Sequence, residues 1–356
     1  MTECIKPSLR SVQMDLLYTY TLPESRIAKE PASPRDSSKL LIYDTKKDTV
    51  KFDTYLNLHK YLPKETLLVM NESKVLPCRV FAKGPKGEDL ELLIMTNEWS
   101  PKDTVLQATV NKKLHPGELV HLPHGHTLTV LESQEKIFKF LADFPLAKLP
   151  HILARIGEMP IPKYIQSCPL TEEELRKKYQ TVFAKKPGSV AAPTASLHFT
   201  PRLFKRLETV GVQTTFVTLH VGLGTFAPVL PEHLATHTLY KELYDIPEQS
   251  ALRIKKHKNS GKPIIAVGTT STRTLESWAK TNTLKGPTDL FILPPYPFQM
   301  LDGLLTNFHI PGSSLMMLVE AFLQSKKAKR HLKDLYAIAL ENDFRFYSFG
   351  DGMLVL

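Results

Sequence analysis

The sequence predicts an α/β fold in which a mainly parallel sheet, with helices on both faces, is interrupted by an inserted antiparallel β-barrel domain. Three observations carry this prediction. Over most of the chain, apolar segments rich in β-branched residues alternate with segments of helical pattern. From roughly residue 76 to residue 144, short strand-like segments follow one another between turns instead. The 356 residues also exceed the roughly 100–200 of a typical domain, which favours two domains.

The inserted barrel is predicted from its alternating segments, which read RVFAKG, DLELLIM, TVLQATV, ELVHL, TLTVLES and KIFKFLADF. The turns between them include KGPKGED, HPGE and PHGH. We therefore expect residues 76–150 to form the barrel, and residues 1–75 and 151–356 to form one discontinuous α/β domain.

The α/β pattern is clearest where a helix leads into a strand. Thr200 and Pro201 are typical of a helix cap and first turn before LFKRLETV, and Gly211 is typical of a helix end before the strand QTTFVTLHV. The segment KPIIAVG likewise leads into TTSTRTLESWAK, and GLLTNFHIPGS leads into SLMMLVEAFL. These units predict parallel strands joined by helices.

Composition restricts the class of protein. No apolar stretch has the length of a signal peptide or a membrane span, and the three cysteines, Cys4, Cys78 and Cys168, suggest free thiols in a reducing compartment. We therefore expect a cytoplasmic protein with no membrane association. The formal net charge of +10 would attract a polyanion such as RNA, although solubility alone also explains it.

Candidate functional residues lie in loops that follow strands, where ligands bind in open α/β sheets. Three of these loops contain a histidine, namely His198, His220 and His309. A single histidine is commonly a hydrogen-bonded core residue, and Gly222-x-Gly224 lacks the third glycine of a dinucleotide-binding motif. Glycines beside a histidine nevertheless suit both ligand binding and proton transfer near neutral pH.

A different loop offers groups for an anion. Thr269, Thr270 and Ser271 supply hydroxyls at a predicted helix start, and Arg273 follows one turn later. This grouping suits a carboxylate or a phosphate, although helix capping alone is the simpler explanation. The histidines of HLPHGHTL are explained by a turn, and no carboxylate or thiol lies nearby in the sequence, so we expect no metal site.

Long motifs then identify a family. The segments MNESKVLPCRV, YQTVFAKKPGSVAAPTASLHF, FVTLHVGLGTFAPV, IIAVGTTSTRTLES, LLTNFHIPGSSLMMLVEAF and FRFYSFGDGML resemble those of the S-adenosylmethionine:tRNA ribosyltransferase-isomerase family. The resemblance extends from about Leu22 to Met353. The chain departs from it at Pro294–Pro297, and at Tyr240–Glu242, where some relatives carry a histidine just before the glutamate.

The resemblance implies an enzyme that moves the ribosyl part of S-adenosylmethionine onto 7-aminomethyl-7-deazaguanine at the wobble position of tRNA. It implies rearrangement to epoxyqueuosine and release of adenine and methionine. S-adenosylmethionine is then a co-substrate, and no other cofactor and no metal are needed. An S-adenosylmethionine-dependent tRNA methyltransferase and a non-catalytic RNA-binding module are the alternatives, and we expect a monomer.

Site residues follow from the resemblance and the loop chemistry together. We expect the acid and the base among His220, His309 and His198, without assigning either task. The S-adenosylmethionine site is expected to comprise Gly222, Gly224, Thr225, Thr269, Thr270, Ser271 and Arg273. We expect Lys74 and Arg79 to contact tRNA, with surface ion pairs at the domain junction as the alternative.

Overall fold

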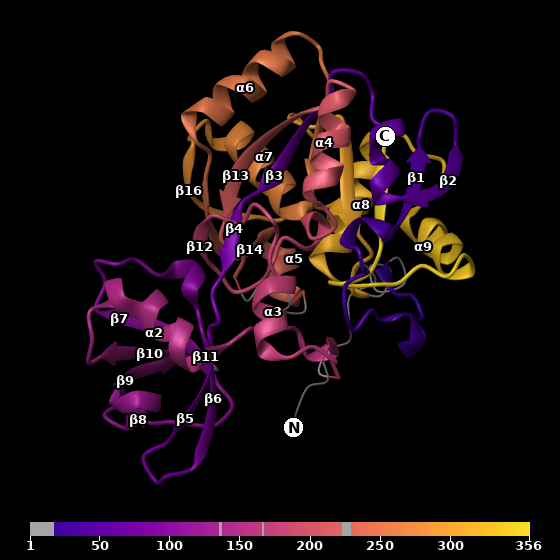
Figure 1. Cartoon of the computed structure of the whole chain (residues 1–356). Helices are drawn as coiled ribbons and strands as arrows, with labels where there is room; N and C mark the ends of the chain where they lie inside the picture. Colours follow the sequence, from indigo (N-terminus) through magenta and orange to yellow (C-terminus); the bar gives the residue numbers. More distant parts are fainter. Residues whose placement is uncertain (1–17, 135–136, 166, 223–228) are drawn as a thin grey trace, which may run out of the picture.

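The computed structural model describes residues 18–134, 137–165, 167–222 and 229–356 (Figure 1). A sheet of nine strands forms the centre of the larger part of this described chain. In spatial order its strands are β16 (Lys285–Leu290), β14 (Thr238–Asp245), β13 (Gln213–Leu219), β3 (Leu67–Asn71), β15 (Ile264–Val267), β17 (Gly303–Asn307), β18 (Gly352–Val355), β1 (Lys39–Asp44) and β2 (Thr49–Thr54).

The sheet is mixed. Its central strands β13, β3, β15 and β17 are parallel, and β1 is parallel to β18. The remaining neighbours, β16 with β14, β14 with β13, β17 with β18 and β1 with β2, are antiparallel. The prediction of a mainly parallel sheet therefore holds only for the central strands. At one edge the reason is local, since residues 45–48 join β1 to β2 and so short a loop permits only an antiparallel hairpin.

The second unit is an antiparallel barrel, as the alternating segments predict. Its strands are β5 (Arg79–Lys83), β6 (Asp89–Ile94), β7 (Val105–Val110), β10 (Ile137–Ala142), β9 (Thr127–Gln134) and β8 (Leu119–His121). Pairing of Lys83 with His121 joins β8 back to β5 and closes the barrel. The short β11 (Gly157–Glu158) pairs with the first two residues of β5. The exact domain boundaries at residues 76 and 150 stay a prediction.

Alternation of side chains explains the barrel. In β6, Leu90, Leu92 and Ile94 are buried in the barrel core, whereas Asp89, Glu91 and Leu93 face outward. This period of two residues is the pattern of a strand with one buried face. Between the barrel and the large sheet, β4 (Ser73–Val75) pairs in parallel with β12 (Lys186–Ser189) (Figure 1).

The helices are α2 (Leu149–Ile156), α3 (Glu172–Lys178), α4 (Pro201–Thr209), α5 (Pro231–Thr236), α6 (Glu248–Asn259), α7 (Thr269–Thr281), α8 (Ser314–Ser325) and α9 (Leu332–Glu341). The predicted units are confirmed, because α4 precedes β13, β15 precedes α7, and β17 precedes α8. Thr200 caps α4 by accepting a hydrogen bond from the Leu203 amide, as its position before Pro201 predicts. None of the described helices is long and apolar enough to span a membrane.

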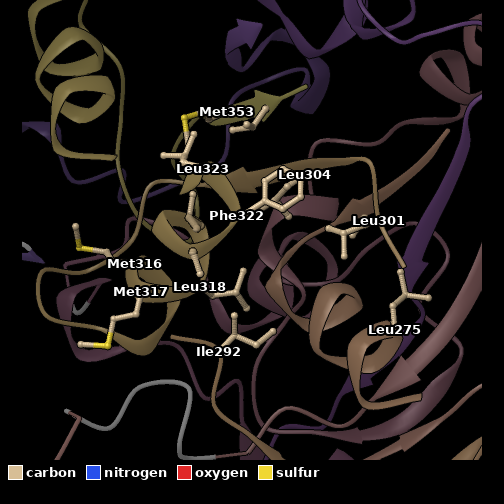
Figure 2. Close-up of a cluster of buried hydrophobic side chains, with 14 of the residues drawn as sticks. Leu275, Ile292, Leu301, Leu304, Met316, Met317, Leu318, Phe322, Leu323 and Met353 are labelled. Atoms are coloured by element: carbon tan, nitrogen blue, oxygen red, sulfur yellow. The ribbon is translucent and has the colours of Figure 1, made fainter. Parts of the chain in front are cut away.

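Strand residues alternate between two hydrophobic cores. On β3, Leu67 and Val69 belong to the larger core with residues of α6, α7, α8 and α9. Leu68 and Met70 belong to a second core with Leu203 and other residues around α4. Figure 2 shows the larger core, where side chains of α7 and α8 meet those of β17. Apolar side chains therefore cover both faces of the central strands, and the polar loops lie at the strand ends.

Candidate active site

His220 lies directly after β13, within a small polar network. Its Nδ1 lies 3.0 Å from the Ser73 Oγ, and the Ser73 and Ser189 hydroxyls are in contact. The Ser189 Oγ also accepts a hydrogen bond from the Val221 amide at 2.9 Å. Pairing of β4 with β12 brings the two serines together, so strand pairing in turn positions the imidazole.

Gly188 gives this imidazole its space. A Cβ atom on Gly188 would lie 2.8 Å from the His220 Nδ1, and the φ angle of +144° is one that other residues rarely adopt. Burial lowers the pKa of His220 to about 4. The charge of Asp245 raises this pKa in part, and the charge of Lys186 lowers it. The imidazole is therefore neutral at pH 7 and available as a proton acceptor.

His309 lies after β17 and borders a cavity of about 60 Å³. Its Nε2 lies 2.9 Å from the Thr306 Oγ1, and its backbone N–H donates to the Tyr336 hydroxyl at 2.8 Å. Burial lowers the pKa of His309 to about 3. This histidine is thus also neutral at pH 7, and it faces space that a ligand group could enter.

His198 has a different environment. Its ring stacks on Tyr55 with ring centroids 4.2 Å apart, and its Nε2 lies 3.5 Å from the Asn307 amide nitrogen. Its side chain is buried, which lowers its pKa to about 3, and it does not line the cavity beside His309. These contacts favour a structural role, and the catalytic role of His198 stays a prediction.

The start of α7 carries two buried polar atoms without partners. Gly268 precedes the helix at a φ of +88°, and the Ser271 hydroxyl donates to the carbonyl of Val267, the last residue of β15, so that hydroxyl already has a partner. In contrast, the Thr270 Oγ1 and the Arg273 Nη2 are buried and have no hydrogen-bond partner among the described residues. They lie three residues apart, hence on one face of the helix.

Arg273 is held by Glu242, a residue that the sequence analysis did not select for the site. The Glu242 carboxylate forms a buried ion pair with the Arg273 Nη1 and also accepts the Gly222 amide at 2.8 Å. The Arg273 Nε donates to the Leu290 carbonyl at 3.1 Å. Glu242 therefore fixes Gly222 relative to α7. The predicted binding residues Gly224 and Thr225 lie outside the described residues.

Adjoining cavities link these groups. Leu315 borders both the His309 cavity and a smaller cavity of about 10 Å³ beside Arg273 and Glu242. On the other side, Tyr164 and Ile310 border both the His309 cavity and a cleft of about 880 Å³ at the barrel. The structure thus brings His309 and Arg273 to adjoining cavities, whereas neither His220 nor its neighbour Gly188 is among the described residues that border them.

The two residues predicted to contact tRNA differ. Lys74 is exposed on β4. Arg79 borders the cleft, but its Nη2 donates to the Ile161 carbonyl at 2.8 Å and its Nε lies 3.2 Å from the Glu91 carboxylate. Arg79 is thus already paired at the junction. Among the residues that the structure describes, no group of three or more His, Cys, Asp or Glu residues could hold a metal ion.

Comparison with known proteins places the chain in a family. Residues 16–355 match the model of a family described as queuosine biosynthesis protein. The S-adenosylmethionine:tRNA ribosyltransferase-isomerase of Caldanaerobacter subterraneus subsp. tengcongensis is 40% identical over 95% of this chain and 98% of that protein. The protein of the same name from Rubrobacter xylanophilus is 39% identical over 95% of this chain and 96% of its own length.

A solved structure agrees with these matches. The crystal structure of S-adenosylmethionine tRNA ribosyltransferase from Thermotoga maritima is 29% identical in sequence and has a TM-score of 0.53. It covers 95% of this chain and 99% of its own. The family model and the relatives both extend over nearly the whole chain, and the motifs that follow β3, β12, β13, β15 and β17 lie within them. The chain therefore belongs to the queuosine biosynthesis protein family.

Proposed function

We propose that this chain transfers the ribosyl part of S-adenosylmethionine onto 7-aminomethyl-7-deazaguanine at the tRNA wobble position and isomerises it. The products are epoxyqueuosine in the tRNA, free adenine and free methionine. The observation that carries the proposal is the family match over residues 16–355, which coincides with neutral histidines and unpartnered polar groups after the parallel strands β13, β15 and β17.

S-adenosylmethionine is proposed to bind between Arg273 and His309. The unpartnered Nη2 of Arg273 and the Thr270 hydroxyl suit the methionine carboxylate, because a charge-assisted hydrogen bond would satisfy both donors. The cavities there hold about 10 and about 60 Å³, below the roughly 300 Å³ of small ligand pockets. Binding therefore requires the lining side chains, Leu315 among them, to move apart.

The reaction needs a group that removes a proton from the 5′ carbon beside the sulfonium. A neutral imidazole can do so, and burial keeps both His220 and His309 neutral at pH 7. We propose His309 first because it borders the cavity, with His220 as the alternative. Removal of the proton leaves its electron pair on the 5′ carbon beside the sulfonium; adenine and methionine leave in later steps, in which the amine of the precursor base bonds to the ribosyl part.

Product analysis tests the function. The purified chain is incubated with S-adenosylmethionine and tRNA carrying the precursor base, and released adenine and methionine are quantified. A methyltransferase would release S-adenosylhomocysteine instead, and an RNA-binding module would release neither product. Either outcome refutes the proposal.

Single-turnover adenine release tests the residues. His309→Ala and His220→Ala are compared. The variant that removes the base should release adenine about 100-fold more slowly or worse, which is the usual scale of general base catalysis. The matched control is His151→Ala, since His151 is exposed on α2. Arg273→Ala should raise the Michaelis constant for S-adenosylmethionine but not that for tRNA. Unchanged rates for both histidine variants would remove them from the mechanism.

Lys74 and Arg79 are proposed to contact tRNA phosphates. Replacing both with glutamine should flatten the salt dependence of tRNA binding by roughly 1.4 logarithmic units per tenfold salt, about 0.7 for each phosphate contact. An unchanged slope would reject direct phosphate contact and leave Arg79 with its ion pair to Glu91 and its hydrogen bond to the Ile161 carbonyl.

A further inference from the structure

One outward face of the barrel forms a wall of the 880 Å³ cleft. Arg79, Leu93 and Thr109 stand opposite one another across β5, β6 and β7, and all three border the cleft. Glu91 borders it in the next row, and its cross-strand partner there is Phe81. Because side chains opposite one another in an antiparallel pair share a face, Phe81 lies on the same barrel face as the cleft wall.

Phe81 is unusually open for a phenylalanine. Its side chain is 50% exposed, although neighbouring strand residues Val80 and Ala82 are buried in the barrel core. A second apolar element faces the barrel across the cleft, because Ile161 and Pro162 border it too. The cleft wall thus includes the half-buried apolar residues Leu93, Ile161 and Ile310, and the exposed Phe81 lies beside this wall without bordering the cleft itself.

Basic side chains stand around these apolar walls. Lys112 and Lys113 follow β7 on the barrel side, and Lys163 lies across the cleft in a short 3₁₀ helix, Lys163–Ile165. All three are exposed. Glu91 is the one acidic residue among those that line the cleft, and it is paired with Arg79. The unpaired charge of the lining is thus positive.

We propose that this cleft binds single-stranded RNA, with bases against the apolar barrel face and phosphates on Lys112, Lys113 and Lys163. Unstacked bases need apolar or aromatic surfaces, and the backbone needs cations beside them, which is the combination present here. A paired duplex would keep its bases away from Phe81. The inference deepens the proposed function and rests on it.

The position of the cleft suits this role. It adjoins the His309 cavity, because Tyr164 and Ile310 border both spaces. A strand lying along the barrel face would therefore lead one unstacked base toward the proposed reaction site. The single-stranded loop that carries the wobble base is the part of a tRNA that can be held in this way.

The first test removes charge. Lys112→Gln, Lys113→Gln and Lys163→Gln are combined, and binding of tRNA and of a ten-nucleotide single-stranded RNA is measured over a salt series. Three lost phosphate contacts should flatten the salt slope by about 2 and weaken binding about 100-fold at 0.1 M salt. The matched control replaces three lysines that are exposed on helices of the α/β part, Lys205, Lys256 and Lys280, and should leave both quantities nearly unchanged. Equal effects of the two triple variants would overturn the proposal.

The second test removes the stacking surface. Phe81→Ala should weaken binding of the single-stranded RNA by about 5- to 100-fold without changing the salt slope, because no charge is lost. Leu131→Ala is the control, since Leu131 is an exposed apolar residue of the barrel that borders a different cavity, beside Trp99 and Leu146. A ten-base-pair duplex that binds as tightly as the single strand, or an ineffective Phe81→Ala change, would also overturn the proposal.

Adenine release distinguishes a failure of the proposed function from a failure of the cleft assignment. If wild-type protein releases no adenine with tRNA, the proposed function fails. If wild type is active and the lysine variant keeps its tRNA affinity, only the cleft assignment fails. For the triple lysine variant, the expected result is a raised Michaelis constant for tRNA with little change in the rate of adenine release at saturating tRNA.

Discussion

Replacement of Glu242 by glutamine should destabilise the whole chain and expose the role of Arg273. Glu242 is 2% exposed and Arg273 is 7% exposed, so their ion pair is removed from water. Glutamine keeps an oxygen that can accept the Gly222 amide, but it removes the negative charge. The guanidinium is then left buried without a counter-charge, which costs about 3–5 kcal/mol.

That cost converts into a measurable melting shift. With about 2.1 cal/mol/K of unfolding entropy per residue, 356 residues give about 0.75 kcal/mol/K. The melting temperature should therefore fall by about 4–7 °C. Saturating S-adenosylmethionine should recover part of this loss, because its carboxylate would supply the missing negative charge beside Arg273.

A paired variant completes the experiment. Glu242→Gln combined with Arg273→Met removes both charges and should regain most of the stability, since no buried charge remains unpaired. The double variant should still bind S-adenosylmethionine poorly, because the carboxylate has lost its partner. Differential scanning calorimetry and ligand titration measure the two quantities. A single variant that melts like wild type would refute the reasoning, and so would a double variant that melts no higher than the single one.

Two further predictions concern the histidines and their glycine neighbour. His198 has a folded pKa near 3 and an unfolded pKa near 6.5, so the unfolded chain takes up a proton that the folded chain refuses as pH falls below 6.5. The free energy of unfolding should therefore decline from pH 6.5 toward pH 4. In denaturant titrations, the His198→Gln variant should show a decline smaller than that of wild type by about 3 kcal/mol. Equal declines in the two proteins would contradict the burial argument. Gly188→Ala should slow adenine release and lower the free energy of unfolding by about 1–3 kcal/mol, because its Cβ would overlap the His220 ring and its φ angle is strained for alanine. Gly211→Ala is the control: it has open space around it and should reduce stability but not activity. A fully active Gly188→Ala variant would contradict the positioning of His220.

Much of the framework could be predicted from local patterns. The alternating segments predict the barrel strands, and the capping residues Thr200 and Pro201 predict the start of α4. Both features depend on neighbours in the sequence, which a pattern can record. The placement of His220 and His309 within two residues of the ends of β13 and β17 follows in the same way.

The parts that could not be predicted depend on contacts between distant segments. Glu242 and Arg273 are 31 residues apart, and nothing in the text around Glu242 indicates a buried carboxylate. Ser73 and Ser189 meet only because β4 pairs with β12, 116 residues later. The environment of His198 depends in the same way on a distant segment, since its ring stacks on Tyr55, which its loop composition does not indicate; its catalytic role stays a prediction.

The low pKa values limit how the proton tasks can be divided. A histidine with a pKa near 3 or 4 is neutral at pH 7. It can therefore remove the proton from the 5′ carbon, but it carries no proton to donate to the departing adenine. Once it has taken that proton it becomes a strong acid, because burial disfavours its charged form. One histidine could then act first as base and afterwards as acid, which requires proton abstraction to precede adenine departure. The rate of adenine release would accordingly show a single acidic limb, near pH 3 if His309 is the base and near pH 4 if His220 is, rather than the bell shape that a separate histidine acid would produce.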